Sequence, residues 1–224
     1  MRVILFGATG MVGSGALLEC IADPRVTSVL SVARRRSGIT DRKVEEVVHE
    51  DFFNYASIRP AFARSDACFF CLGVSSAGLD EAEYRRQTYD LTLAAAGAIA
   101  AVSPGLTFCY ISGVGTDSSE RGRTMWARVK GATENALLAL PFKAAFMFRP
   151  GFIQPLKGVR SSTKLYQAFY SVAAPMYPLL RSLTPNSVTT TVNLGKALIE
   201  VSIAGYPRRI LETADINRVA AGNL

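Results

Sequence analysis

Histidine is almost absent from this 224-residue sequence, in which His49 is the only one. A site built on two histidines is therefore excluded, and with it the common zinc centres that use a histidine pair. Tryptophan is equally scarce, because Trp126 stands alone. We predict no metal site in this protein.

Cysteine is also sparse, with four residues in the whole chain: Cys20, Cys68, Cys71 and Cys109. All four fall inside predicted helices or strands, which indicates buried thiols in a reducing compartment. Cys68 and Cys71 are three residues apart in one predicted strand, so their side chains point to opposite faces and a redox or metal pair is not expected. Because the N-terminus leads directly into a predicted strand, with no secretory signal, we expect a cytoplasmic protein.

Long unbroken apolar runs are missing as well. The apolar and aromatic stretch 165–183 is interrupted by Pro175, Pro178 and Arg181, whereas a membrane-spanning helix needs about 20 clean residues. We therefore predict no transmembrane segment. We interpret this stretch as a helical lid or a subunit contact over the substrate side, with peripheral membrane contact as the alternative.

Positive charge is in excess but dispersed. The net charge is +7, and residues 34–36 form the only basic cluster. No motif for binding DNA or RNA accompanies it, so we predict no nucleic-acid partner and keep a nucleic-acid role only as the alternative.

The clearest signal lies at the start of the chain. The apolar run 3–6 stops at Gly7, and Gly10 and Gly13 follow before a helical apolar pattern begins. This spacing predicts a strand, a tight turn and a helix whose N-terminal N–H groups and dipole face a pyrophosphate. The residues expected to bind the cofactor here are Gly7, Thr9, Gly10, Met11, Val12 and Gly13.

The basic cluster lies at the end of the second predicted strand, 28–33. An acidic residue at this point would accept from the ribose 2′-OH of NAD, but the sequence has Arg34, Arg35 and Arg36 instead. Guanidinium groups suit a 2′-phosphate, so we predict NADP(H) over NAD(H), with Arg34 and Arg35 as the contacts. The alternative is a solvated basic loop.

Strand and helix patterns alternate along the chain. Continuous apolar strands, such as 67–72, are typical of a parallel sheet covered on both faces. We predict a single α/β domain over residues 1–224, a doubly wound, mostly parallel Rossmann-like sheet with helices on both faces and a small C-terminal elaboration in 151–224. The predicted strands are 2–6, 28–33, 44–48, 66–72, 106–112, 143–148 and 208–211, and the predicted helices are 11–22, 55–63, 80–102, 122–139, 194–204 and 215–220, with 151–162 as a loop.

Taken together, these features resemble the short-chain dehydrogenase/reductases, in their atypical or extended branch, and most of all the nucleotide-binding proteins related to the Tat-interacting-protein group. The likeness covers about residues 1–155. It rests on the glycine turn, the basic end of the second strand, and the residues Asp51, Cys71, Leu72, Gly73, Ser112, Lys130, Arg149, Pro150 and Gly151. The part from 151 onward resembles the family's variable, substrate-binding end.

The resemblance implies further cofactor contacts. Asp51 and Phe52 lie where the family contacts adenine, although Asp51 could equally cap the next helix. Leu72 and Gly73 lie where the family's backbone lines the ribose and pyrophosphate. Pro150, Gly151, Phe152 and Ile153 are implied as neighbours of the nicotinamide.

The resemblance also implies a catalytic set, with one departure. Family chemistry uses a serine that orients the carbonyl, a tyrosine that gives the proton, and a lysine four residues later that binds the nicotinamide ribose. Ser112 and Lys130 match, but Trp126 stands at the tyrosine position. An indole N–H donates a hydrogen bond without releasing its proton near neutral pH, so Trp126 cannot be the acid.

Other tyrosines are candidates for the missing acid. Tyr110 shares a sheet face with Ser112 by strand period, although a core tyrosine is the stronger interpretation. Tyr84, Tyr89, Tyr166 and Tyr170 cannot be ranked. Arg128, two residues before Lys130, is expected to face solvent.

The function we predict is an NADPH-dependent oxidoreductase that reduces a small carbonyl or quinone-like substrate. The alternative is a non-catalytic NADP(H)-binding regulator or scaffold, favoured by Trp126. A sugar-nucleotide epimerase or dehydratase is a weaker third reading, because those enzymes need the tyrosine and a larger C-terminal domain. Small residues in 80–102 fit either packing within the chain or a homodimer interface.

Overall fold

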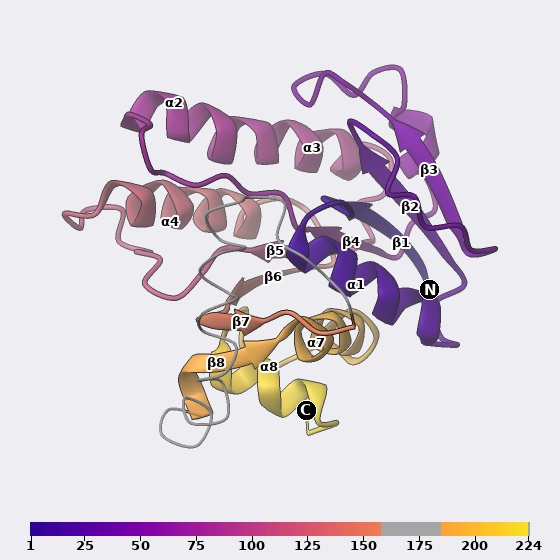
Figure 1. The fold of residues 1–224 in the computed structure, drawn as a ribbon. Coiled ribbons are helices and arrows are strands. Elements are labelled where there is room, and N and C mark those ends of the chain that lie inside the picture. The colour runs from indigo at the N-terminus through magenta and orange to yellow at the C-terminus, as the bar shows by residue number, and fades with distance from the viewer. Residues whose placement is uncertain (158–184, 224) are drawn as a thin grey trace.

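A seven-stranded parallel sheet forms the centre of the computed structural model, which describes residues 1–157 and 185–223 (Figure 1). The strand order is β3-β2-β1-β4-β5-β6-β9, and all six pairings are parallel. The strands are β1 (Arg2–Phe6), β2 (Ser28–Ala33), β3 (Val44–Val48), β4 (Ala67–Phe70), β5 (Thr107–Ile111), β6 (Ala144–Arg149) and β9 (Ile210–Glu212). The predicted doubly wound α/β fold is confirmed.

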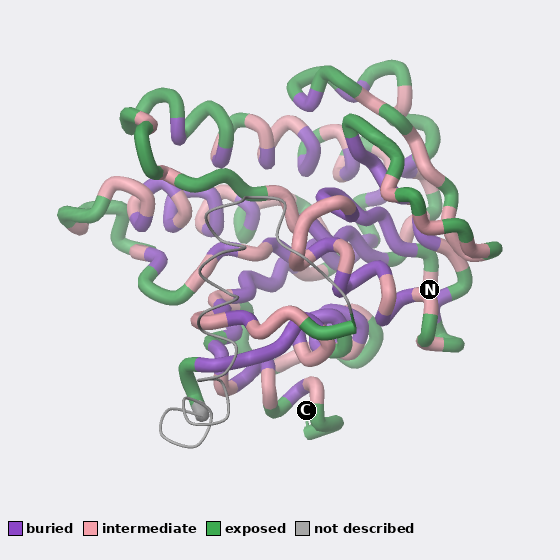
Figure 2. The backbone as a smooth tube through the Cα atoms, viewed as in Figure 1, coloured by how far each residue is buried: buried purple, intermediate pink, exposed green. Residues whose placement is uncertain are grey.

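Helices cover the sheet on both faces, as Figure 1 shows. One face carries α1 (Met11–Ala22), α7 (Thr191–Ala204) and α8 (Thr213–Ala220), and the other carries α3 (Leu91–Ala100) and α4 (Met125–Leu138). Side chains of β1 alternate between the two cores, because neighbours in a strand point to opposite faces: Val3 packs with α1, and Ile4 with α3. Buried residues follow the strands and the inner sides of these helices (Figure 2).

Two predicted helices differ from the structure. The segment 55–63 contains only a short 3₁₀ helix, η1 (Arg59–Phe62), which has Pro60 in its first turn. The segment 80–102 is divided into α2 (Glu81–Arg85), a π-helical turn η2 (Arg86–Asp90) and α3. A π-turn has backbone hydrogen bonds between residues i and i+5 instead of i and i+4, and it requires no particular residue type. Periodicity in the sequence therefore does not reveal it.

The C-terminal part adds a second, small sheet. β7 (Phe152–Gln154) pairs in parallel with β8 (Val188–Thr190), which follows a 3₁₀ turn, η4 (Pro185–Ser187). The prediction of a loop over 151–162 is therefore wrong for its first residues. The interpretation of 165–183 as a lid or contact segment, and with it the membrane alternative, lies outside the described residues. Among those described, no helix is long and apolar enough to cross a membrane.

The small residues of α3 pack within the chain. Ala95, Ala96 and Ile99 are buried in the core of their sheet face, and Ala94 and Ala98 pack against it. In the described residues, packing within the chain thus accounts for most of the small residues of α3.

Candidate functional site

A cleft of about 460 Å³ opens at the carboxyl ends of β1, β2 and β4. The order of the sheet reverses here, because β2 lies on one side of β1 and β4 on the other. Ligands of open parallel sheets bind at such reversal points. The lining residues are Gly7, Thr9, Gly10, Ala33, Arg34, Arg35, Phe52, Cys71, Leu72 and Gly73.

The glycine turn forms the floor of this cleft. Gly7 has a φ of +84°, and a Cβ on it would lie 2.8 Å from the carbonyl oxygen of Cys71. A Cβ on Gly13 would lie 2.1 Å from the carbonyl oxygen of Gly7. Gly10 precedes α1 without a side-chain cap, and the first turn of α1 holds no acidic residue. The helix N-terminus therefore faces the cleft with backbone N–H groups and no competing carboxylate.

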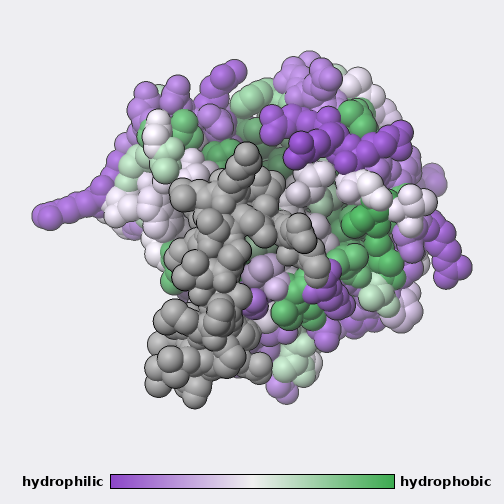
Figure 3. Space-filling model, viewed as in Figure 1, coloured by the Kyte–Doolittle hydropathy of each residue, from purple (hydrophilic) through white to green (hydrophobic). Residues whose placement is uncertain are grey.

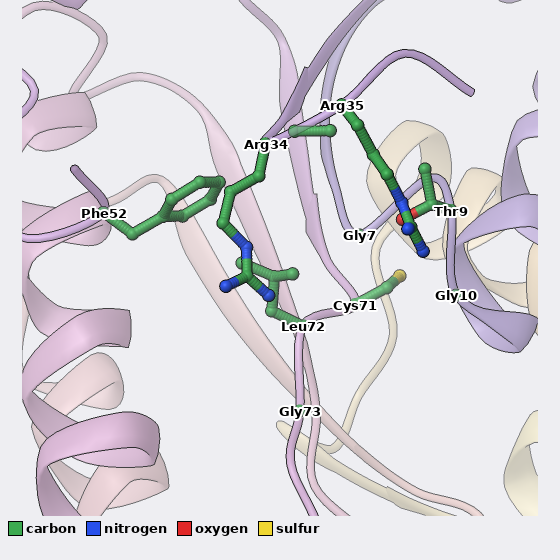
Figure 4. Close-up of a pocket in the computed structure, with 10 residues that line it drawn as sticks. Gly7, Thr9, Gly10, Arg34, Arg35, Phe52, Cys71, Leu72 and Gly73 are labelled. Carbon is green, nitrogen blue, oxygen red and sulfur yellow. The ribbon is translucent and has the colours of Figure 1, made fainter. Parts of the chain in front are cut away.

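Two arginines reach this cleft from the end of β2. Figure 4 shows Arg35 pointing toward Thr9 and Arg34 pointing toward Leu72, beside the ring of Phe52. Both arginines are exposed, whereas Phe52 is buried. Hydrophilic side chains gather over the region of β2 and β3 on this face (Figure 3). The positive charge and the apolar wall suit an anionic group next to an aromatic base.

The remaining cofactor predictions lie beside the cleft. Met11 and Val12 are partly buried on α1 and pack against the core. Gly13 packs directly against the backbone of Gly7 in the glycine turn. Asp51 is exposed and accepts a hydrogen bond from Phe53 N at 3.0 Å, so it stabilises a local turn and begins no α-helix. Its contact with adenine stays a prediction.

The segment after β6 connects the sheet to the C-terminal part. Gly151 N donates to Thr213 Oγ1 at 2.8 Å, and a Cβ on Gly151 would lie 2.3 Å from the carbonyl oxygen of Ser187. Pro150 and Ile153 are buried, and Phe152 opens β7. None of these residues lines the cleft, and their contact with a nicotinamide stays a prediction.

Ser112 and Lys130 meet at the end of β5. Lys130, on α4, donates from Nζ to the carbonyl oxygen of Ser112. Burial lowers the pKa of Lys130 to about 8, against a smaller opposing effect of the Glu134 carboxylate. The structure therefore brings the predicted serine and lysine together, through the serine backbone.

The Ser112 hydroxyl is already engaged. Ser112 is buried, and its Oγ lies 2.5 Å from Glu134 Oε1 and 3.0 Å from the carbonyl oxygen of Phe148. Both neighbours are acceptors, so the single hydroxyl proton points to one of them.

The sequence reasoning missed Glu134 and gave Arg149 no role of its own. Glu134 is fully buried, and Arg149 donates to it twice, from Nε at 3.0 Å and from Nη2 at 2.5 Å. Two signals could have found the pair: Glu134 follows Lys130 by four residues on one helix face, and Arg149 ends an apolar strand. Cys71 and Ala33, which also line the cleft, were not predicted to bind the cofactor, although both adjoin residues that were.

Trp126 lies one helical turn before Lys130, at the start of α4. Its indole packs near the turn after β5, since a Cβ on Gly115 would lie 3.3 Å from the ring atom Cη2. Tyr110 and Tyr84 are both buried, and burial raises the pKa of Tyr110 above its ordinary value. Neither tyrosine lines the cleft, and the candidates Tyr166 and Tyr170 lie outside the described residues.

The expectation that Arg128 is merely solvated is corrected. Its Nη2 lies 2.6 Å from Glu81 Oε2, and its Nη1 donates to the carbonyl oxygen of Gly122 at 2.7 Å. Arg128 therefore connects α4 to α2 and to the loop before α4.

Solved structures share this fold. The reductase domain of PhqB from Penicillium fellutanum superposes with a TM-score of 0.67 at 17% identity, over 96% of this chain and 67% of that one. A short chain dehydrogenase family protein from Francisella tularensis gives 0.64 at 12% identity, over 91% of each chain. The chain thus shares the Rossmann-like fold of these proteins. The narrower likeness to the Tat-interacting-protein group stays a prediction.

The relatives found by sequence are proteins named FMP52. The mitochondrial protein fmp52 of Emericella nidulans is 32% identical over 159 residues, 68% of this chain and 66% of that protein. The mitochondrial protein FMP52 of Saccharomyces cerevisiae is 31% identical over 170 residues, 73% of this chain and 69% of that protein. The chain thus spans about two thirds of the length of these relatives. No protein-family model matches it.

The predicted cytoplasmic location is corrected by these relatives. Their names place them in mitochondria. Buried thiols argue only against an oxidising location and do not separate one reducing compartment from another, which is why the prediction was wrong. Because the chain is 31% identical to the Saccharomyces cerevisiae protein and covers 69% of its length, it belongs to the FMP52 family.

Proposed function

We propose that this protein binds NADP(H) in the cleft at the end of β1 and reduces a small carbonyl or quinone-like substrate. The observation that carries the proposal is the pairing of the glycine turn with Arg34 and Arg35 in one cleft. The positions of Gly7 and Gly13 leave no room for a Cβ, so main-chain atoms form the floor. A pyrophosphate fits such a floor because backbone N–H groups and the helix dipole both favour an anion.

The preference for NADP(H) rests on the end of β2. Arg34 and Arg35 both line the cleft, and no carboxylate is present among the lining residues to accept from a ribose 2′-OH. Phe52 supplies an apolar wall on the same side for adenine. These residues would hold the adenosine half of the cofactor and would favour a 2′-phosphate.

The nicotinamide half of the cofactor would lie at the carboxyl end of β5. When bound, the reduced cofactor supplies a hydride for a substrate carbon. Lys130 would hold the nicotinamide ribose, and Trp126 would form an apolar contact for the ring or the substrate. The residues from 151 onward would form the substrate side of the same domain, in a mitochondrial protein like the named relatives.

A direct test separates binding from turnover. We would titrate NADPH and NADH into the purified chain by calorimetry and follow the emission of Trp126, the only tryptophan. NADPH should bind more tightly than NADH and quench the emission. Oxidation of NADPH would then be measured with phenanthrenequinone as the probe acceptor. A chain that binds neither nucleotide contradicts the proposal.

A second candidate function is a non-catalytic NADP(H)-binding regulator. The observation in its favour is the Ser112 hydroxyl, which lies within hydrogen-bond distance of two acceptors of the protein itself, Glu134 Oε1 and the Phe148 carbonyl oxygen, while Trp126 stands where the resemblance implies a tyrosine. This candidate predicts tight binding of NADPH with no oxidation by carbonyl or quinone acceptors. The same two measurements therefore distinguish the candidates.

A further inference from the structure

One face of α4 holds Ser112 at two points. Lys130 and Glu134 are four residues apart, so their side chains lie on the same side of the helix. Lys130 Nζ donates to the Ser112 carbonyl oxygen, while Glu134 Oε1 accepts from the Ser112 hydroxyl at 2.5 Å. Ser112 is thus held to two successive turns of α4, through its carbonyl oxygen and through its hydroxyl.

Glu134 is itself fixed from the other side. Its carboxylate is fully buried and receives two hydrogen bonds from Arg149 at the end of β6. Arg149 also donates to Ser118 Oγ at 2.5 Å and lies 3.5 Å from Glu212 at the end of β9. A buried ion pair is weak evidence for added stability, because desolvation offsets much of its attraction. Its value here is geometric, since one carboxylate connects α4 to the ends of β5 and β6.

We propose that Glu134 is a positioning residue: it holds Ser112 in the orientation in which the Ser112 carbonyl fixes the Lys130 ammonium at the carboxyl end of the sheet. The proposal rests on the proposed function only in that Lys130 would there meet the ribose of NADP(H). It also reassigns Ser112. A hydroxyl whose proton points to Glu134 or to the Phe148 carbonyl orients no substrate carbonyl while that bond lasts, so Ser112 acts through its backbone.

The charge of Glu134 acts on Lys130 as well. Burial lowers the pKa of Lys130 to about 8, and the Glu134 carboxylate is the charged group that opposes this shift. Around that carboxylate, the described charged groups are Arg149 from β6 and, beyond it, Glu212 from β9. Removing the Glu134 charge should therefore lower the pKa of Lys130 further and leave less ammonium near neutral pH.

The test compares Glu134→Gln with the wild-type chain in a readout that needs no cofactor. The protein is labelled with ¹³C-lysine, the Lys130 signal is assigned through Lys130→Arg, and its titration midpoint is read by NMR. We expect the midpoint to fall by about half a pH unit or more in Glu134→Gln. A drop of one unit would weaken NADPH binding at pH 8 about fivefold, because the ammonium fraction falls from about a half to about a tenth.

A matched control isolates positioning from general loss of structure. Asp215, on α8, is another buried acid, and its Oδ1 lies 2.6 Å from Nη2 of Arg208, which precedes β9. Asp215→Asn should destabilise the fold but leave the Lys130 midpoint unchanged. An unchanged midpoint in folded Glu134→Gln, or an equal shift in Asp215→Asn, overturns the proposal.

Ser112→Ala is the second variant, and it decides the matter even if Glu134→Gln does not fold. It removes the hydroxyl link and keeps every charge. We expect the Lys130 signal to shift and broaden as the Ser112 carbonyl loses its fixed orientation, and an unaltered Lys130 signal contradicts the proposal. If the wild-type chain binds no NADPH, the proposed function fails, but the Lys130 titrations still decide the role of Glu134.

Discussion

A Cβ atom placed on Gly13 would lie 2.1 Å from the carbonyl oxygen of Gly7, well inside any real contact. The start of α1 therefore packs directly on the turn that forms the floor of the cleft. In Gly13→Ala the helix must move away from this turn. We expect the free energy of unfolding to fall by about 1–3 kcal/mol, as in other overpacked sites, and NADPH binding to be lost. Urea unfolding and calorimetry would measure the two effects.

Gly97→Ala is the control for this change. Gly97 is exposed in α3, and a Cβ there meets nothing within 4 Å. Alanine should leave NADPH binding intact and raise stability by up to about 1 kcal/mol, because glycine is a poor helix former. If Gly13→Ala behaves like Gly97→Ala, the close packing of turn and helix is not what shapes the cleft.

The second prediction concerns the choice between the two nucleotides. Replacing Arg34 and Arg35 with Ala removes the two guanidinium groups that line the cleft. A hydrogen bond to a charged group is worth about 1.5–3 kcal/mol, so NADPH affinity should fall about 10-fold or more. NADH affinity should change much less, because NADH has no 2′-phosphate. Calorimetric titration of both nucleotides gives the ratio.

Arg36→Ala serves as the matched control. Arg36 is exposed, next in sequence, and not among the residues that line the cleft. It should have little effect on either nucleotide. Equal losses of NADPH and NADH affinity in the double variant would count against the 2′-phosphate assignment.

Much of the framework follows from local sequence signals. The strands β1, β4, β5 and β6 were predictable because buried parallel strands read as nearly continuous apolar runs. The glycine turn was predictable because close backbone approach demands glycine, as the position of Gly13 illustrates. Both signals sit within about ten residues of chain, and this is why a single sequence reveals them.

The features that were missed depend on partners far away in sequence. Glu134 reads as a solvent-facing helix residue until Arg149, fifteen residues later, is brought against it. β7 and β8 are three residues each, and their pairing joins Phe152 to Val188. The turn η2 arises where α2 and α3 pack on α4. Tertiary contacts decide each of these features, and local propensity alone does not predict them.

A third prediction uses a thiol as a reporter of the cleft. Cys71 lines the cleft and is partly exposed, whereas Cys20, Cys68 and Cys109 are buried. Burial raises the pKa of all four thiols, so reaction with a disulfide reagent should be slow and should accelerate as the pH rises. Cys71 should react first, and saturating NADPH should protect it.

Cys71→Ser provides the check on this assignment. The early phase of thiol modification should disappear in this variant, while the three slower thiols react as before, in step with unfolding. Modification of Cys71 at the same rate with and without bound NADPH would place the nucleotide outside the cleft described here.

The fourth prediction addresses the missing acid. Trp126 lies one turn before Lys130 on α4, so a tyrosine at this position would lie on the same face of the helix as Lys130. General acid catalysis contributes about 10²–10⁴-fold to rate. If the chain is a reductase limited by proton supply, Trp126→Tyr should therefore raise NADPH oxidation by phenanthrenequinone by a large part of this factor. The ring is smaller than indole, so a stability loss of about 1–2 kcal/mol is expected from the unfilled volume.

Trp126→Phe separates the hydroxyl from the change of ring. It should lose the same stability and gain no rate, because it has no proton to give. A rate gain in both variants would mean that the indole obstructs the substrate. No gain in either, with NADPH still bound, would mean that the Ser112 hydroxyl is held away from substrate by Glu134 whatever acid is supplied, and it would favour the regulatory function.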